Sequence, residues 1–429
     1  MVRGGRRSGR PCRPPARRTA RRTMNEAWRA RIVDLLKPQR FDQPGVGLGR
    51  AYLPELDSLR FFAFLLVYGF HNGLPALGAT IRDTLAVTID LPWLLVSGSG
   101  GIGGILGRSV DYALGHNGWI GVNVFFVLSG FIITRLLLQE ESKTGRIDWK
   151  AFWIRRILRI WPLYYVIFLI GFLGIPGARA SVPGVGLGSP HAPWFALFLG
   201  NWSMVYRGPI ESDILSVLWS VCVEEQFYVI IPIVIAALGL RGRLAFCLAG
   251  TCLAVWRRWA LASAGVRQYM ITYDSLAQMD AILVGVTLAI AANDPFMRPK
   301  LEWLTRNVLA WSVLPLTVLL MTTSHLGHDI THKRVWDPVA VWVVAVMWVL
   351  TAAVAPPRWS AFLRWPGFVY LGKISYGLYM WHEVLLSLFG GGVATLLGVM
   401  LTAWASYRFL ERPVLKFKHR WSRVESRPV

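Results

Sequence analysis

A histidine and an arginine in the first long apolar stretch of the chain could carry chemistry. Arg60 and His71 stand eleven residues apart, and on an α-helix that spacing places them on one face, about 16 Å from each other. A histidine inside an apolar span is costly unless it faces a polar interior, which favours a functional role over a purely structural hydrogen bond. An imidazole can accept a proton from a hydroxyl near neutral pH. We therefore predict that His71 is a general base for acyl transfer from a thioester to an alcohol.

Carboxylates in later apolar stretches could partner this histidine. Glu224 and Glu225 occur in the block LWSVCVEEQFYVIIP, which should place them one to two turns inside the external boundary of a membrane. Asp280 and the His-Glu pair at 382–383 lie at comparable depths in two further stretches. A carboxylate bound to His71 would orient the imidazole and stabilise its protonated form. We predict Glu224, Glu225 and Asp280 as the catalytic carboxylates, without deciding which one pairs with the histidine.

A cluster of arginines opens another apolar stretch, in the sequence RRILRIWP. Guanidinium groups at the cytoplasmic end of a span could bind the phosphates of a CoA. They could equally be anchors that fix the orientation of the span, and the spacing alone does not separate the two readings. Arg60 should lie near the same boundary. We predict that Arg60, Arg156 and Arg159 bind the donor.

These residues need a membrane-embedded scaffold. The chain is 54% hydrophobic and 16% charged, with 21 tryptophans among its 429 residues, which is too apolar for an ordinary soluble protein of this length. Several stretches approach the roughly 20 apolar residues that a helix needs to cross a bilayer. We predict an all-α integral membrane protein with ten spans, at 60–78, 119–138, 153–173, 218–238, 244–262, 272–292, 307–323, 339–355, 370–388 and 391–411.

The positive charge of the chain indicates its orientation. The net charge of +22 is concentrated in the tails and in short loops between spans, which fits the positive-inside rule better than nucleic-acid binding. We predict a basic, disordered cytoplasmic tail at 1–50, a transmembrane domain at 51–411 and a basic cytoplasmic tail at 412–429. The apolar segment 194–205 is too short to cross, so we expect it to be re-entrant or interfacial.

Several weaker patterns carry less chemistry. The cysteines lack the paired spacing of a metal site, and we expect no metal, although His325, His328 and His332 could collect one if helical. The G-x-G-x-x-G match at 98–103 follows no strand and does not indicate dinucleotide binding. The WRRW sequence at 256–259 is typical of a membrane interface but could also bind a sugar or lipid phosphate.

Six blocks, in order, closely resemble the acyltransferase-3 family from about Leu56 to Pro413: LDSLRFFAFLLVYGFHN (56–72), GVNVFFVLSGFIITRLL (121–137), RRILRIWPLYYV (155–166), LWSVCVEEQFYVIIP (218–232), ISYGLYMWH (374–382) and SYRFLERP (406–413). The resemblance implies ten transmembrane helices in a bacterial inner membrane and a cytoplasmic acyl-CoA donor. It implies an acceptor such as lipopolysaccharide, exopolysaccharide or another envelope or secreted saccharide. By position, the family's motif residues are Arg60 with His71, Arg156 with Arg159, and Glu224 with Glu225. One departure is Met279, which precedes Asp280 where family members commonly carry an arginine nearby.

Together these patterns predict a membrane-bound O-acyltransferase. It would transfer an acyl group, with acetyl the expected one, from cytoplasmic acetyl-CoA to a hydroxyl of an envelope carbohydrate or glycolipid. We expect membrane lipids as partners and no nucleic acid. The alternative is a transporter or flippase that uses the same buried histidine and carboxylates to relay protons or bind a moving substrate.

Overall fold

The computed structural model describes residues 47–50, 52–73, 118–174, 185–309, 330–354 and 361–417, together with residues 1, 312, 313 and 317. Every regular element within these ranges is helical. His325, His328 and the glycine-rich segment 98–103 lie outside the described residues, and of His332 only the helical backbone is described, so the predictions for them stay untested.

Seven helical stretches in this part of the chain are long and apolar enough to cross a bilayer. They coincide with seven of the predicted spans, and the prediction of an all-helical, multi-pass membrane protein is confirmed. The number of ten spans and the cytoplasmic position of both termini stay predictions. The seven stretches are Gly118–Thr144, Trp149–Leu173, Asp213–Ala237, Leu240–Ser263, Ser275–Asn293, Arg334–Val354 and Val393–Phe417.

The other three predicted spans differ from a single long α-helix. The first is α2 (Pro54–Tyr68), which continues into five π-helical residues, η1 (Gly69–Gly73). The ninth is divided at Ile374 into α18 (Pro366–Lys373) and α19 (Ser375–Phe389). Most of the predicted span 307–323 lies outside the described residues. Single π-helical turns inside helices often occur at functional sites, and η1 contains His71.

The helix α5 (Gly118–Thr144) lies at the centre of the bundle, where it packs against α2, α13 (Ser275–Asn293) and α10 (Leu218–Ala237). Its closest contact uses two glycines. A Cβ on Gly130 would lie 2.1 Å from the Ile282 carbonyl oxygen, and one on Gly285 would lie 2.2 Å from that of Val127. Small residues let two membrane helices approach until their backbones touch. Any larger side chain at these positions would push α5 and α13 apart.

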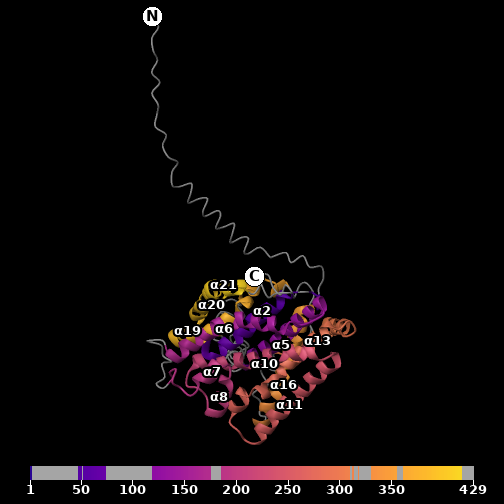
Figure 1. Ribbon diagram of the computed structural model, residues 1–429, viewed down its shortest axis with the longest axis horizontal. Coiled ribbons are helices and arrows are strands. Elements are labelled where there is room, and N and C mark those ends of the chain that lie inside the picture. Colours follow the sequence, from indigo (N-terminus) through magenta and orange to yellow (C-terminus); the bar gives the residue numbers. More distant parts are fainter. Residues whose placement is uncertain are drawn as a thin grey trace, which may run out of the picture.

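Two helix pairs lie at opposite sides of the bundle (Figure 1). One side carries α11 (Leu240–Ser263) and α16 (Ile330–Val354), and the other carries α20 (Val393–Ser406) and α21 (Arg412–Phe417). The apolar windows of α11 and of the α20–α21 stretch are largely exposed within the protein, whereas those of α5 and α13 are largely buried. Exposed apolar surface of this kind suits contact with lipid.

The short apolar segment 194–205 forms two brief helices, α7 (Ala192–Ala196) and α8 (Gly200–Arg207), joined by a turn in which Phe198 has a positive φ of 57°. Neither helix is long enough to cross a bilayer, in agreement with the sequence. Gln226, from the Glu-Glu-Gln-Phe-Tyr block, holds the turn. Its side-chain amide donates to the Phe198 carbonyl at 2.9 Å and to Asn201 Oδ1 at 2.8 Å.

Candidate active site

The structure brings His71 together with a glutamate and a second histidine from α19. His71 Nδ1 lies 3.2 Å from Glu383 Oε1 and 3.2 Å from His382 Nε2. The remaining side of this triangle, from His382 Nε2 to Glu383 Oε1, is 3.5 Å. The sequence placed the pair 382–383 at the right depth but gave no reason to prefer it over the other carboxylates. Glu383 is the carboxylate that contacts His71 in the structure.

Hydrogen-bond partners assign the protons in this cluster. His382 Nδ1 contacts the backbone carbonyl of Tyr379, which can only accept, so this nitrogen carries the proton. In the neutral form of His382, Nε2 then presents a lone pair toward His71, beside the carboxylate of Glu383. Because both neighbours accept, His71 Nδ1 must donate. The lone pair of a neutral His71 therefore lies on Nε2, since Nδ1 is the nitrogen that contacts Glu383 and His382.

The three side chains differ in exposure. The His382 side chain is fully buried and that of Glu383 is 7% exposed, whereas that of His71 is 29% exposed. Rings pack around the histidines edge to face, with Phe70 against His71 and Phe64 against His382. Such apolar walls limit the access of water to the buried pair. Of the three, His71 is the group best placed to meet a substrate.

The α19 backbone that carries His382 and Glu383 is fixed to a neighbouring element. The Tyr379 hydroxyl contacts Ser220 Oγ at 2.7 Å and donates to the Val217 carbonyl at 3.0 Å. Both partners belong to the 213–237 stretch, so a buried tyrosine sets the rotation of α19. Tyrosine is suited to this because its ring packs in the core while its hydroxyl finds a polar partner.

Glu224 and Glu225 lie with arginines and not with His71. The Tyr228 hydroxyl donates to Glu224 Oε2 at 2.9 Å, and Glu224 interacts electrostatically with Arg60 and Arg156. The sequence suggested a position near the external boundary because it began the span at residue 218. The helical stretch begins at Asp213, which moves both glutamates to its middle.

Only one carboxylate oxygen of the neighbouring Glu225 has a hydrogen-bond partner among the described residues. Trp161 Nε1 donates to Glu225 Oε2 at 3.0 Å, while the buried Oε1 atom has no hydrogen-bond partner in the described part of the chain. Arg156 interacts electrostatically with Glu225, and Arg159 does so with Glu411, near the end of the family-like part of the chain. The three predicted donor-binding arginines therefore lie among three carboxylates, the third of which the sequence did not single out.

Asp280 has a different partner from the one predicted. Arg258 Nη2 lies 2.5 Å from Asp280 Oδ2, and both side chains are at most 1% exposed. Trp342 Nε1 donates to the same oxygen at 3.1 Å. Arg258, on α11, thus supplies the arginine that is missing beside Met279 in the sequence. This contact joins α11, α13 and α16, which favours a structural role for Asp280.

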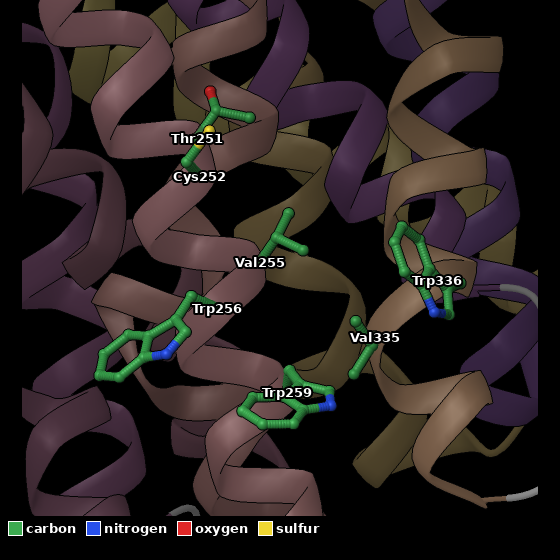
Figure 2. A pocket seen from close by; sticks show the side chains of 7 residues that line it. All are labelled: Thr251, Cys252, Val255, Trp256, Trp259, Val335 and Trp336. Atoms are coloured by element: carbon green, nitrogen blue, oxygen red, sulfur yellow. The ribbon is translucent and has the colours of Figure 1, made fainter.

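In the WRRW sequence the two arginines form ion pairs and the two tryptophans line a groove. Arg257 Nη2 pairs with Asp274 at 3.0 Å, so both arginines bind aspartates. The tryptophans at 256 and 259 line an apolar groove between α11 and α16 (Figure 2). The other side chains of the groove are Thr251, Cys252, Val255, Val335 and Trp336. None of the lining residues belongs to the His71 cluster, and binding of a sugar or lipid phosphate there stays a prediction.

Comparison with known proteins places this arrangement in a family. A Listeria monocytogenes peptidoglycan O-acetyltransferase is 23% identical over 86% of this chain and 56% of its own length. A Staphylococcus aureus protein provisionally named as an O-acetyltransferase is 27% identical over 85% of this chain and 58% of its own. A Bacillus subtilis protein provisionally named as a peptidoglycan O-acetyltransferase is 25% identical over 85% and 55%. The chain spans little more than half the length of these relatives, and no solved structure matches it. The model of an acyltransferase domain, acyltransferase-3, matches residues 53–409, and the chain therefore belongs to the acyltransferase-3 family.

Proposed function

We propose that the chain transfers an acetyl group from cytoplasmic acetyl-CoA to a hydroxyl of a cell-envelope carbohydrate or glycolipid, in the bacterial inner membrane. The observation that carries this proposal is the contact between His71 and Glu383, which leaves one lone pair of a partly exposed imidazole available. The names of the relatives support acetyl as the group and a saccharide as the acceptor. Acyl transfer to an alcohol needs this kind of base near neutral pH.

The proposed reaction uses His71 as a proton carrier. Its Nε2 accepts the proton of the acceptor hydroxyl while the hydroxyl oxygen bonds to the thioester carbonyl carbon. Glu383 and His382 face the Nδ1 proton, and the carboxylate stabilises the imidazolium that forms. When the carbon–sulfur bond breaks, the imidazolium donates its proton to the departing thiolate. The products are the ester and free CoA, with no covalent enzyme intermediate.

The sequence-predicted residues take distinct places in this scheme. Arg60, Arg156 and Arg159 are the proposed ligands of the donor phosphates, since guanidinium groups suit phosphate oxygens. Glu224 and Glu225 would hold Arg60 and Arg156 in position, because they interact with them. Asp280 has no proposed role in the reaction. Glu383 replaces all three as the partner of the base.

The proposal is tested with detergent-purified protein, acetyl-CoA labelled in the acetyl group, and envelope polysaccharide from the host. We expect release of free thiol together with an acetyl mass increment on the saccharide. A trapped acetyl-enzyme would contradict direct transfer. Uptake or release of a saccharide by proteoliposomes, with no thiol release under any condition, would favour the transporter alternative.

A further inference from the structure

We propose that the cluster of His71, His382 and Glu383 also binds a divalent transition-metal ion, with Zn²⁺ the best match, and that the bound ion inhibits transfer. The inhibition rests on the proposed function, whereas the binding does not. From the sequence we expect no metal, and two of the ligands of this site, His71 and His382, are 311 residues apart along the chain. The three donor atoms meet only when η1 packs beside α19.

The three donor atoms have the spacing of a metal site. Each residue offers one ligand atom, and their separations are 3.2, 3.2 and 3.5 Å. Three atoms bound tetrahedrally at the usual zinc distances of about 2.0–2.2 Å lie roughly 3.3–3.6 Å apart. Two imidazoles and one carboxylate form a donor set that zinc commonly takes in proteins. The ion would need no large movement of the backbone.

The surroundings also suit a metal ligand. A coordinating histidine usually donates its other nitrogen to a carbonyl or carboxylate, which fixes the ring. His382 does this through Nδ1 and the Tyr379 carbonyl, so its Nε2 already presents a lone pair to the cluster. The His71 side chain is 29% exposed, which leaves one open side through which an ion and a fourth ligand, such as water, could enter.

The same geometry explains why the ion would inhibit. Without metal, one proton on His71 Nδ1 faces two acceptors, and Nε2 is free to act as the base. A metal on Nδ1 displaces that proton, and the neutral ring then carries it on Nε2. The number of protons on the ring is unchanged, but Nε2 can no longer accept one from a hydroxyl. Metal and proton thus compete for one nitrogen.

The binding test uses purified protein with an affinity tag that contains no histidine. Wild type is dialysed against Zn²⁺, and the bound metal is measured by plasma mass spectrometry. We expect one tightly bound equivalent in wild type and its loss in His382→Gln and Glu383→Gln. The exposed thiol of Cys252 and the histidines of the 324–338 segment are other groups that zinc could bind. Cys252→Ser and a triple variant, His325→Ala with His328→Ala and His332→Ala, should therefore keep the equivalent.

Cobalt provides a second readout that needs no activity. Co²⁺ in a tetrahedral site gives strong visible absorption, which we expect in wild type and in His191→Ala, a histidine that instead contacts Ser203 at 2.9 Å. Glu383→Gln should lack it while eluting as a single species on size exclusion. Failure of wild type to bind either ion, or full binding in both cluster variants, would overturn the site.

The inhibition is tested separately on active protein. Added Zn²⁺ should lower the rate of thiol release at least tenfold, and a chelator should restore it. A chelator that abolishes the activity of freshly purified protein would overturn inhibition, because the ion would then support the reaction. If wild type turns over no acetyl-CoA at all, the proposed function fails while the result of the binding test still stands.

Discussion

His71 and Glu383 contact each other at 3.2 Å although one belongs to the first helix of the bundle and the other to a helix near its end. This pairing gives His71 the carboxylate partner that the proposed base requires. It also gives His71 a partner other than Glu224, which interacts with Arg60 and Arg156.

Glu383→Gln should slow the reaction without disturbing acyl-CoA binding. The amide keeps the shape of the side chain but removes the charge that stabilises the imidazolium. We expect kcat to fall about 10- to 100-fold, a part of what a positioned acid–base group contributes, with KM for acetyl-CoA changed little. Steady-state thiol release measures both constants. Glu211→Gln, at an exposed position, is the matched control, and an equal fall in both variants would count against the pair.

Arg159→Gln should weaken donor binding. If Arg159 binds a phosphate of CoA, its loss removes a charge-assisted hydrogen bond worth about 1.5–3 kcal/mol, and KM for acetyl-CoA should rise more than kcat falls. The same assay with Arg207→Gln, at an exposed helix end, should show wild-type constants. A normal KM in Arg159→Gln would remove this residue from the donor site.

Asp280→Asn should lower the stability of the protein, with no direct effect on the transfer reaction. It leaves the buried Arg258 guanidinium without its counter-charge, and breaking such a pair costs about 3–5 kcal/mol. We expect a lower thermal midpoint in detergent. The double variant Arg258→Met with Asp280→Leu should recover much of it, since both charges are then removed. A stable but inactive Asp280→Asn protein would return this aspartate to the mechanism.

Gly130→Ala should separate α5 from α13. The added methyl group would meet the Ile282 carbonyl at 2.1 Å, and overpacking of this kind typically costs about 1–3 kcal/mol. Thermal unfolding measures the loss. Gly188→Ala is the control, because a Cβ at that glycine meets nothing within 4 Å. Equal midpoints for both variants would mean that the two helices do not touch at this glycine.

Local patterns in the sequence were sufficient to predict the helices and to single out Arg60 and His71 as candidates, because both features depend on spacing along one segment. The His71 partner was not predictable in this way. It depends on the break at Ile374, which starts α19 in a new register, and on the packing of that helix near η1. Several carboxylates fitted the same depth, and depth alone could not choose among them.

The sequence contains a sign of the partner of Asp280. Arg258 lies inside an otherwise apolar stretch, where a cation must find an anion, and Asp280 stands in the next predicted span. Met279, the residue before Asp280, is not an arginine, and the arginine that contacts Asp280 is Arg258 on a neighbouring helix. Buried charges on consecutive spans are best considered as pairs before any of them is assigned to catalysis.

The most direct test of the account compares wild type with His71→Ala in the acetyl-transfer assay, with and without added imidazole. We predict at least a 100-fold loss of thiol release and of saccharide acetylation in the variant, with a normal size-exclusion profile, since a positioned base contributes about 10²- to 10⁴-fold. Imidazole, which can occupy the cavity left by the side chain, should restore part of the rate. Equal rates in wild type and His71→Ala would contradict the role of His71 as the base.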